Sequence, residues 1–174
     1  MKNLKLSDHF SLYELTVTSN AALQEANRDI TDDQVVKLKA LAAHGEAIRA
    51  ICGGGPIIVH SGYRSPALNG ATVGASGTSQ HPRCEAIDFH VVGQDLATTF
   101  DLLLVAARAG KFRFGQLILE SADRGYASVA WIHCSVIGTL DQAKVGQVLR
   151  MQAGLDGKQH YLLVAKLNLE AGAA

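Results

Sequence analysis

The sequence predicts an α+β fold in a single domain, with helices packed on a small, mainly antiparallel sheet. The chain has 174 residues, which suits one compact domain, and 48% of them are hydrophobic, which is enough for a sizeable core. Segments with the periodicity of a helix alternate with short runs typical of strands, and the last strands are joined by polar turns. No internal repeat or linker divides the sequence.

The first third of the chain is expected to hold a short helix, a long helix and a strand. Residues 11–15 predict a helix because their serine and glutamate have the spacing of a capping box. Apolar residues at helical spacing predict a second helix over 31–52, which ends at the GGGP sequence of residues 53–56. The β-branched run at 57–60 predicts a strand.

The middle of the chain is expected to supply the rest of the sheet. An alternating apolar pattern predicts the first of these strands, and a helical pattern ending at a glycine follows it. Two more strands are joined by a polar turn, which makes them antiparallel neighbours. In order, the elements are a strand at 86–91, a helix at 94–109 and strands at 116–120 and 129–135.

A C-terminal extension, residues 141–174, is expected to form a hairpin packed on the domain of residues 1–140. Two apolar runs, 147–152 and 161–167, flank a Leu-Asp-Gly sequence, and Asp-Gly between apolar runs is a turn signal.

Residues 61–82 differ in composition from the rest of the chain. Glycine, serine, threonine, asparagine and proline dominate this segment, and apolar residues are sparse. A loop of this length inside a compact domain is more often functional than accidental. We therefore expect it to border a functional site.

Charge and cysteine content exclude several classes of protein. Sixteen basic and sixteen acidic residues give a formal net charge of zero, which argues against a nucleic-acid binder that relies on a basic field. No apolar run reaches the roughly 20 residues of a membrane span. Three cysteines without CxxC spacing indicate free thiols rather than a disulfide framework. The first twelve residues lack the hydrophobic core of a secretion signal, so synthesis in the cytoplasm without a signal peptide is expected.

Two histidines and one aspartate form the main candidate site. His81 precedes the strand that contains Asp88, and His133 lies in a later strand. Asp88 in a strand otherwise fit for burial needs a partner, such as a metal ion, an arginine or a backbone donor. Two histidines and a carboxylate would leave zinc an open fourth position, as hydrolytic sites require. The alternative is that each histidine is a partly buried imidazole with ordinary hydrogen bonds.

Several motifs in this order resemble one family, the zinc D-alanyl-D-alanine carboxypeptidases and their phage endolysin relatives. This family is part of the lysostaphin/D-Ala-D-Ala metallopeptidase/Hedgehog group, and the resemblance covers roughly residues 8–136. The opening FSLYEL sequence is similar to that of the phage and prophage branch. The other motifs are SGYRS at 61–65, Asn69 with Val73-Gly74, the Ser-x-His…Ala-x-Asp segment at 79–88, and Trp-Ile-His at 131–133.

The resemblance implies Zn²⁺ as cofactor, with His81, Asp88 and His133 as its ligands. Arg64 matches the arginine that binds the substrate's carbonyl or carboxylate, and a guanidinium is a good donor to a developing oxyanion. The alternative for Arg64 is a structural salt bridge. Further residues are expected to contact substrate or to support the ligands: Ser79, Tyr63, Gln116, Trp131 and His60.

The chain departs from the family pattern at two positions. Many members have glycine where this chain has Cys84. If that glycine adopts a positive φ, the backbone of a cysteine is strained there. If the glycine is needed only for space, the cysteine side chain narrows the turn. Many members also have the catalytic carboxylate at the position of Ala130. We expect Glu120 to replace it as general base, since pairing the two strands would place Glu120 near Val129 and Gln116 near His133.

Two other acids could serve as the base, and Glu120 could instead be a solvated strand end. These fallback bases are Asp123, in the turn after Glu120, and Glu85, beside the metal motif.

The sequence as a whole predicts a monomeric zinc peptidase of the cell wall, with residues 1–140 as its catalytic domain. The expected substrate is a peptidoglycan stem peptide, cleaved by a D-Ala-D-Ala carboxypeptidase or an endopeptidase. A phage or prophage origin is expected, with action on the wall after release or within a phage particle. The alternative is a catalytically inactive phage tail, structural or wall-binding protein on the same fold. Zinc as a purely structural staple is a weaker alternative, because such sites have four protein ligands.

Overall fold

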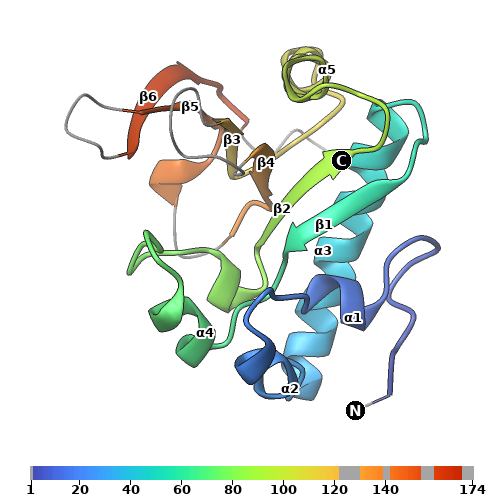
Figure 1. Ribbon diagram of the computed structural model, residues 1–174. Coiled ribbons are helices and arrows are strands. Elements are labelled where there is room, and N and C mark those ends of the chain that lie inside the picture. The colour runs from blue at the N-terminus through green and yellow to red at the C-terminus, as the bar shows by residue number, and fades with distance from the viewer. Residues whose placement is uncertain (1, 122–129, 139–141, 154–158, 170–174) are drawn as a thin grey trace.

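A computed structural model of the chain describes residues 2–121, 130–138, 142–153 and 159–169 (Figure 1). Its elements, in order, are α1 (Leu12–Leu15), η1 (Ala21–Leu23), α2 (Gln24–Asn27), α3 (Asp32–Ile51), β1 (Ile57–Ser61), α4 (Pro66–Ala71), η2 (His81–Arg83), β2 (Ala86–Val91), α5 (Leu96–Arg108), β3 (Gln116–Ser121), β4 (Ala130–Ser135), η3 (Gln142–Lys144), β5 (Gln147–Ala153) and β6 (Gln159–Lys166).

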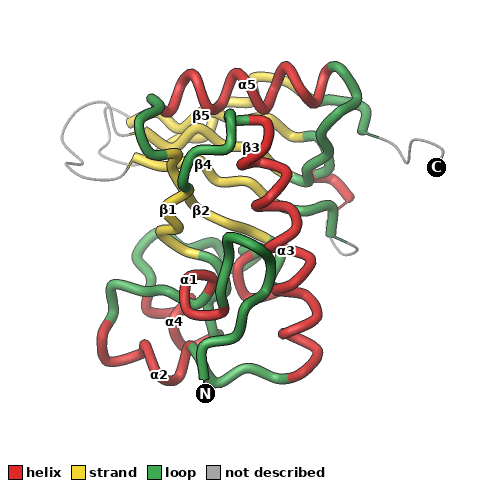
Figure 2. The backbone as a smooth tube through the Cα atoms, turned by 90° about the vertical axis from the view of Figure 1, so that its right-hand side faces the viewer, coloured by secondary structure: helices red, strands yellow, loops and turns green. Residues whose placement is uncertain are grey.

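One six-stranded sheet organises the molecule, in the order β1-β2-β4-β3-β5-β6. Every neighbouring pair is antiparallel except β3 and β5, which run parallel. The long helices α3 and α5 contact each other and pack on the central strands, while α1, α2 and α4 gather at the end of the molecule away from α5 (Figure 2). The predicted α+β fold with a mainly antiparallel sheet is confirmed.

The predicted helices and strands are present with small changes at their ends. Capping boxes at Ser11 and Thr31 begin α1 and α3, because each side chain accepts the third helical N–H and the third residue returns a bond. Helix α5 begins two residues later than expected, since Asp95 caps it. Residues 61–82 are not one irregular loop. They contain α4, which Ser65 caps.

The central strands have one face toward the helices and one toward an open cleft. In β2, Ile87 and Phe89 belong to the hydrophobic core, whereas Asp88 lines the cleft. In β4, Ile132 and Cys134 are in the core and His133 lines the cleft. This alternation follows from the two-residue period of a strand. The polar residues of these strands therefore collect on one side of the sheet.

The pairing of β3 with β4 differs from our expectation by two residues. His133 lies opposite Ile118 rather than Gln116, and Glu120 lies opposite Trp131 rather than Val129, which is outside the described residues. Gly115 lies close to the first pair of this register. Its N–H donates to the carbonyl of Ser135 over 2.8 Å, and a Cβ on it would lie 2.5 Å from the carbonyl oxygen of Val136. A shift of two keeps each residue on its predicted face.

The C-terminal strands continue the sheet. Strand β5 pairs in parallel with β3, and β6 pairs with β5 as the second strand of a hairpin and forms the sheet edge. We call β5 and β6 the C-terminal hairpin. Among the described residues, no helix has the length and apolar character that crossing a membrane requires.

Candidate metal centre

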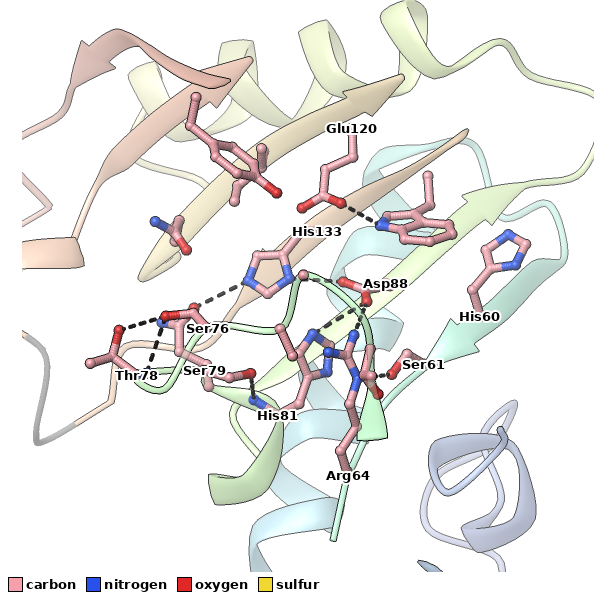
Figure 3. A pocket seen from close by; sticks show the side chains of 18 of the residues that line it. His60, Ser61, Arg64, Ser76, Thr78, Ser79, His81, Asp88, Glu120 and His133 are labelled. Carbon is pink, nitrogen blue, oxygen red and sulfur yellow. Dashed lines mark hydrogen bonds and ion pairs between the residues drawn. The ribbon is translucent and has the colours of Figure 1, made fainter. Parts of the chain in front are cut away.

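The three predicted ligands meet at one point. One ligand atom from each of His81, Asp88 and His133 lies within 4.8 Å of the others. Asp88 and His133 are directly paired across β2 and β4, and the short η2 turn brings His81 over them (Figure 3). All three side chains are buried. Sequence-distant residues are thus gathered by strand pairing and one turn.

Asp88 is the centre of this cluster. One carboxylate oxygen lies 2.8 Å from Nδ1 of His133, and the other lies 2.7 Å from Nη2 of Arg64 and 3.3 Å from Nε2 of His81. Burial alone would raise the pKa of Asp88, but the charges and hydrogen bonds of His81 and His133 outweigh it and hold the pKa well below its usual range. The site therefore keeps a buried carboxylate ionised.

The imidazole of His81 is held so that its Nε2 faces Asp88. Its Nδ1 lies 2.6 Å from the carbonyl oxygen of Gly62, which only accepts, so Nδ1 carries the proton. Only glycine fits at residue 62, because a Cβ there would lie 2.4 Å from the carbonyl oxygen of Leu15. A lone pair on Nε2 is left for a metal ion.

Gln80 orients His133 in the same way. Its Nε2 donates to Oγ of Ser135 over 2.8 Å, which turns its Oε1 toward Nε2 of His133 at 3.1 Å. Nε2 of His133 then carries the proton, and Nδ1 is the atom that faces Asp88. No local sequence signal marks Gln80, although it directly precedes His81, because its burial is visible only in the fold.

These residues fit a zinc ion. Zinc prefers imidazole nitrogen and carboxylate oxygen, and each histidine here has its second ring nitrogen bonded to an oxygen acceptor, as in known zinc sites. Three protein ligands, His81, Asp88 and His133, would leave a position for substrate or water. This is the donor set of a hydrolytic rather than a structural site.

Glu120 has the environment of a general base. It lines the cleft from β3, and its Oε2 accepts from Nε1 of Trp131 over 2.9 Å. Burial, reinforced by the negative charge of Asp88, raises the pKa of Glu120 to about 7. A carboxyl group with such a pKa can both take up and release a proton near neutral pH.

The two fallback bases are placed differently. Asp123 lies outside the described residues. Glu85 is bound by Nε of Arg83 over 2.7 Å and is not part of the cleft lining. Among the described acids of the cleft, Glu120 is therefore the one that is available to accept a proton.

Arg64 lies beside the cluster and lines the cleft. Nε donates to Oγ of Ser61 over 2.8 Å and Nη2 donates to Asp88. The salt bridge that the sequence analysis left open is thus present. A guanidinium has five N–H groups, and these two contacts leave others for a ligand. Ser79 also lines the cleft, and its Oγ accepts from the backbone N–H of His81 over 3.4 Å.

The remaining predicted site residues divide into two groups. Gln116, Trp131 and His60 line the cleft, as expected of residues near substrate. Tyr63 does not: its side chain is buried in the hydrophobic core. The register of β1 shifts between Val59 and Ser61, and such a bulge reverses which following residues point inward.

Cys84 ends the turn that carries His81 and has a left-handed backbone, with φ at 60° and ψ at 32°. Of the two explanations for glycine at this position in relatives, a positive φ is the one that applies here. A left-handed conformation costs a residue with a Cβ about 1–2 kcal/mol. The turn that places His81 is therefore strained.

The cleft has a volume of about 1000 Å³ and is lined by polar and apolar groups. Its floor is the polar face of β2, β4 and β3. One side is formed by residues 72–80 and the other by the C-terminal hairpin, through Leu149, Tyr161 and Leu163. This size suits a peptide segment rather than a single small ion.

Comparison with known families gives one finding. A family model described as peptidase M15 matches residues 8–135, which spans the cluster, Arg64 and Glu120 but not the C-terminal hairpin. Comparison with curated proteins finds no significant match.

Proposed function

Because the chain belongs to the peptidase M15 family, we propose that it is a zinc-dependent peptidase that hydrolyses a peptide bond in peptidoglycan stem peptides. The observation that carries the proposal is the buried cluster of His81, Asp88 and His133 at the floor of a cleft that also holds Glu120. A metal-binding set beside a proton acceptor, both open to a peptide-sized cleft, is what hydrolysis of an amide requires.

The chain's own residues have separate roles in this reaction. A bound zinc ion would supply Lewis acidity toward the carbonyl and acidify water. The carboxylate of Glu120 accepts the proton of the attacking water and then gives it to the leaving amine. Arg64 donates its remaining N–H groups to the oxygen that becomes negative at the attacked carbon. The bond from Trp131 holds the Glu120 carboxylate in place.

The substrate class and the biological setting are inferred from the sequence motifs. The resemblance to D-Ala-D-Ala carboxypeptidases and endolysins supports a stem peptide as substrate. The FSLYEL opening supports a phage or prophage lysin, or a virion component, which reaches the wall after release. Glu120, the acid that replaces the carboxylate missing at Ala130, supports an active enzyme over an inactive scaffold.

The test is mass spectrometry of stem peptides and purified peptidoglycan incubated with the zinc-loaded protein. New products that disappear on chelation are expected, and their masses identify the bond. Glu120→Gln is the matched control, because it keeps an acceptor for Trp131 and should lower turnover by about 10²–10⁴-fold while retaining zinc. If the metal-loaded protein yields no product from any wall type, the proposal fails and the structural or wall-binding alternative gains support.

A further inference from the structure

Tyr161 brings a hydroxyl group into the cleft from the C-terminal hairpin. It lies on β6 opposite Met151 of β5, and β5 in turn pairs with β3, the strand of Glu120. Tyr161 and Leu163 are two residues apart, share one face of β6 and line the cleft. The hairpin is outside the matched span of residues 8–135, so this wall is a feature of the present chain beyond the family match.

The side chain of Tyr161 is near the chemistry and has no partner within the described parts of the chain. Burial, together with the negative charges of Glu120 and Asp88, raises the pKa of Tyr161 to about 12. The phenol therefore stays protonated, and it is a hydrogen-bond donor at any working pH. None of the described residues forms a hydrogen bond with its hydroxyl, and the side chain is 45% exposed.

The rest of this wall is largely apolar. Leu163 is 62% exposed, and Leu149 and Ile118 line the cleft beside it, while the polar Gln147 of β5 accepts from the amide of Gln116. A mainly apolar lining with a few directed polar groups is typical of a site that binds an organic ligand. The charges of Glu120 and Asp88 would repel an anion at the phenol. The group that suits the phenol is therefore a neutral acceptor, such as a peptide carbonyl.

We propose that the hydroxyl of Tyr161 donates a hydrogen bond to a carbonyl oxygen of the bound peptide, while Leu163 packs against an apolar part of the same peptide. The C-terminal hairpin is then a substrate-binding wall that complements the metal centre. This inference rests on the proposed function, because the ligand is the peptide substrate. It adds residues to the binding site that no family motif indicates.

Kinetics of Tyr161→Phe on a stem pentapeptide ending in D-Ala-D-Ala test the hydroxyl. A neutral hydrogen bond made equally in ground and transition states would raise KM by about 3–10-fold on removal and leave kcat unchanged. Leu163→Ala should also raise KM, through lost packing. Tyr13→Phe is the matched control: Tyr13 is outside the cleft lining, and its ring keeps the contact with Arg28. Bound zinc should be equal in all variants.

A binding measurement separates this inference from the proposed function. Trp131 is the single tryptophan of the chain and lines the cleft, so its fluorescence reports peptide binding without turnover. In a Glu120→Gln background, adding Tyr161→Phe should weaken binding of the pentapeptide by about 3–10-fold. Equal affinity and equal KM would overturn the role of Tyr161 and leave the peptidase intact. No binding of the pentapeptide to the Glu120→Gln protein would also overturn the role of Tyr161, whereas the proposed function is decided by the products formed from peptidoglycan.

Discussion

Two parts of the cleft are built in opposite ways. At the part of the floor formed by β2, β4 and the η2 turn, which we call the metal-centre wall, each functional atom is held by a second buried group. On the C-terminal hairpin, Tyr161 and Leu163 are exposed, and within the described parts of the chain no group forms a hydrogen bond with the Tyr161 hydroxyl. A fixed array of donors suits an ion, which needs preset ligands, whereas exposed apolar groups suit a peptide. Rigidity is thus concentrated where the chemistry is expected.

Replacement of Asp88 by alanine should have the largest effect, and only on the metal-centre wall. It removes the contact shared by both histidines and leaves the part-buried guanidinium of Arg64 without its ion pair. We expect loss of zinc and a fall in activity well beyond about 100-fold, the upper range for groups that only support a ligand. Metal analysis and turnover measure it. Leu163→Ala on the hairpin should keep full zinc occupancy, and equal zinc loss in both variants would refute the division between the walls.

Glu120→Gln tests the proton transfer that the metal-centre wall is expected to serve. Loss of a general base lowers kcat by about 10²–10⁴-fold, with zinc retained. Since the carboxyl must be ionised to accept a proton, kcat/KM of the parent enzyme should fall as the pH drops below the pKa of Glu120. That pKa is about 7 without a metal ion, and a bound cation would lower it. The residual activity of the variant should not show this fall of kcat/KM at low pH. If the fall persists in the variant, the proton is accepted by a group other than Glu120.

Gln80→Met tests whether the ligands depend on their supporting bonds. The substitution removes the acceptor for Nε2 of His133, and zinc affinity should fall by about 10–100-fold. Gln116→Met is the matched control, because the amide of Gln116 bonds to Gln147 of the hairpin and not to a ligand. Competition with a chromogenic chelator measures both affinities. Equal affinity for Gln80→Met and the parent would show that the histidine orientation needs no such bond.

The sequence predicts faces and element types well, but not registers or burial of polar residues. Strand alternation correctly places Asp88, His133 and Glu120 on one side of the sheet, because successive side chains of a strand point to opposite faces. The register of β3 with β4 cannot be read from this alternation, because a shift of two residues keeps every side chain on the same face. Tyr63 was named from its place in the SGYRS motif, and its burial in the hydrophobic core is visible only in the fold.

Contributions that come from distant parts of the chain are likewise not predictable from local patterns. The segment of residues 61–82 was expected to border the site. The group by which it holds His81, however, is a backbone carbonyl, that of Gly62, which accepts from Nδ1 of the imidazole. Any residue type supplies a carbonyl, so the sequence carries no sign of it. The hairpin was expected from its Asp-Gly turn. Its position beside β3, which brings Tyr161 to the cleft, follows from a parallel pairing that the pattern does not specify.

Substitution of Cys84 should have the smallest effect, a change in stability of the η2 turn that positions His81. Replacing Cys84 by glycine removes both backbone strain and a buried side chain, so the comparison with the parent mixes two effects of opposite sign. Comparing Cys84→Gly with Cys84→Ala removes most of this mixture, because both variants lose the sulfur. At a φ of 60°, the glycine variant should be the more stable by about 1 kcal/mol, which is about 2–4 °C in melting temperature for a chain of this size. Thermal unfolding of the metal-free proteins measures the difference. An alanine variant as stable as the glycine variant would mean that the η2 turn accepts a Cβ without strain, and that the position of His81 is set by its bond to Gly62 instead.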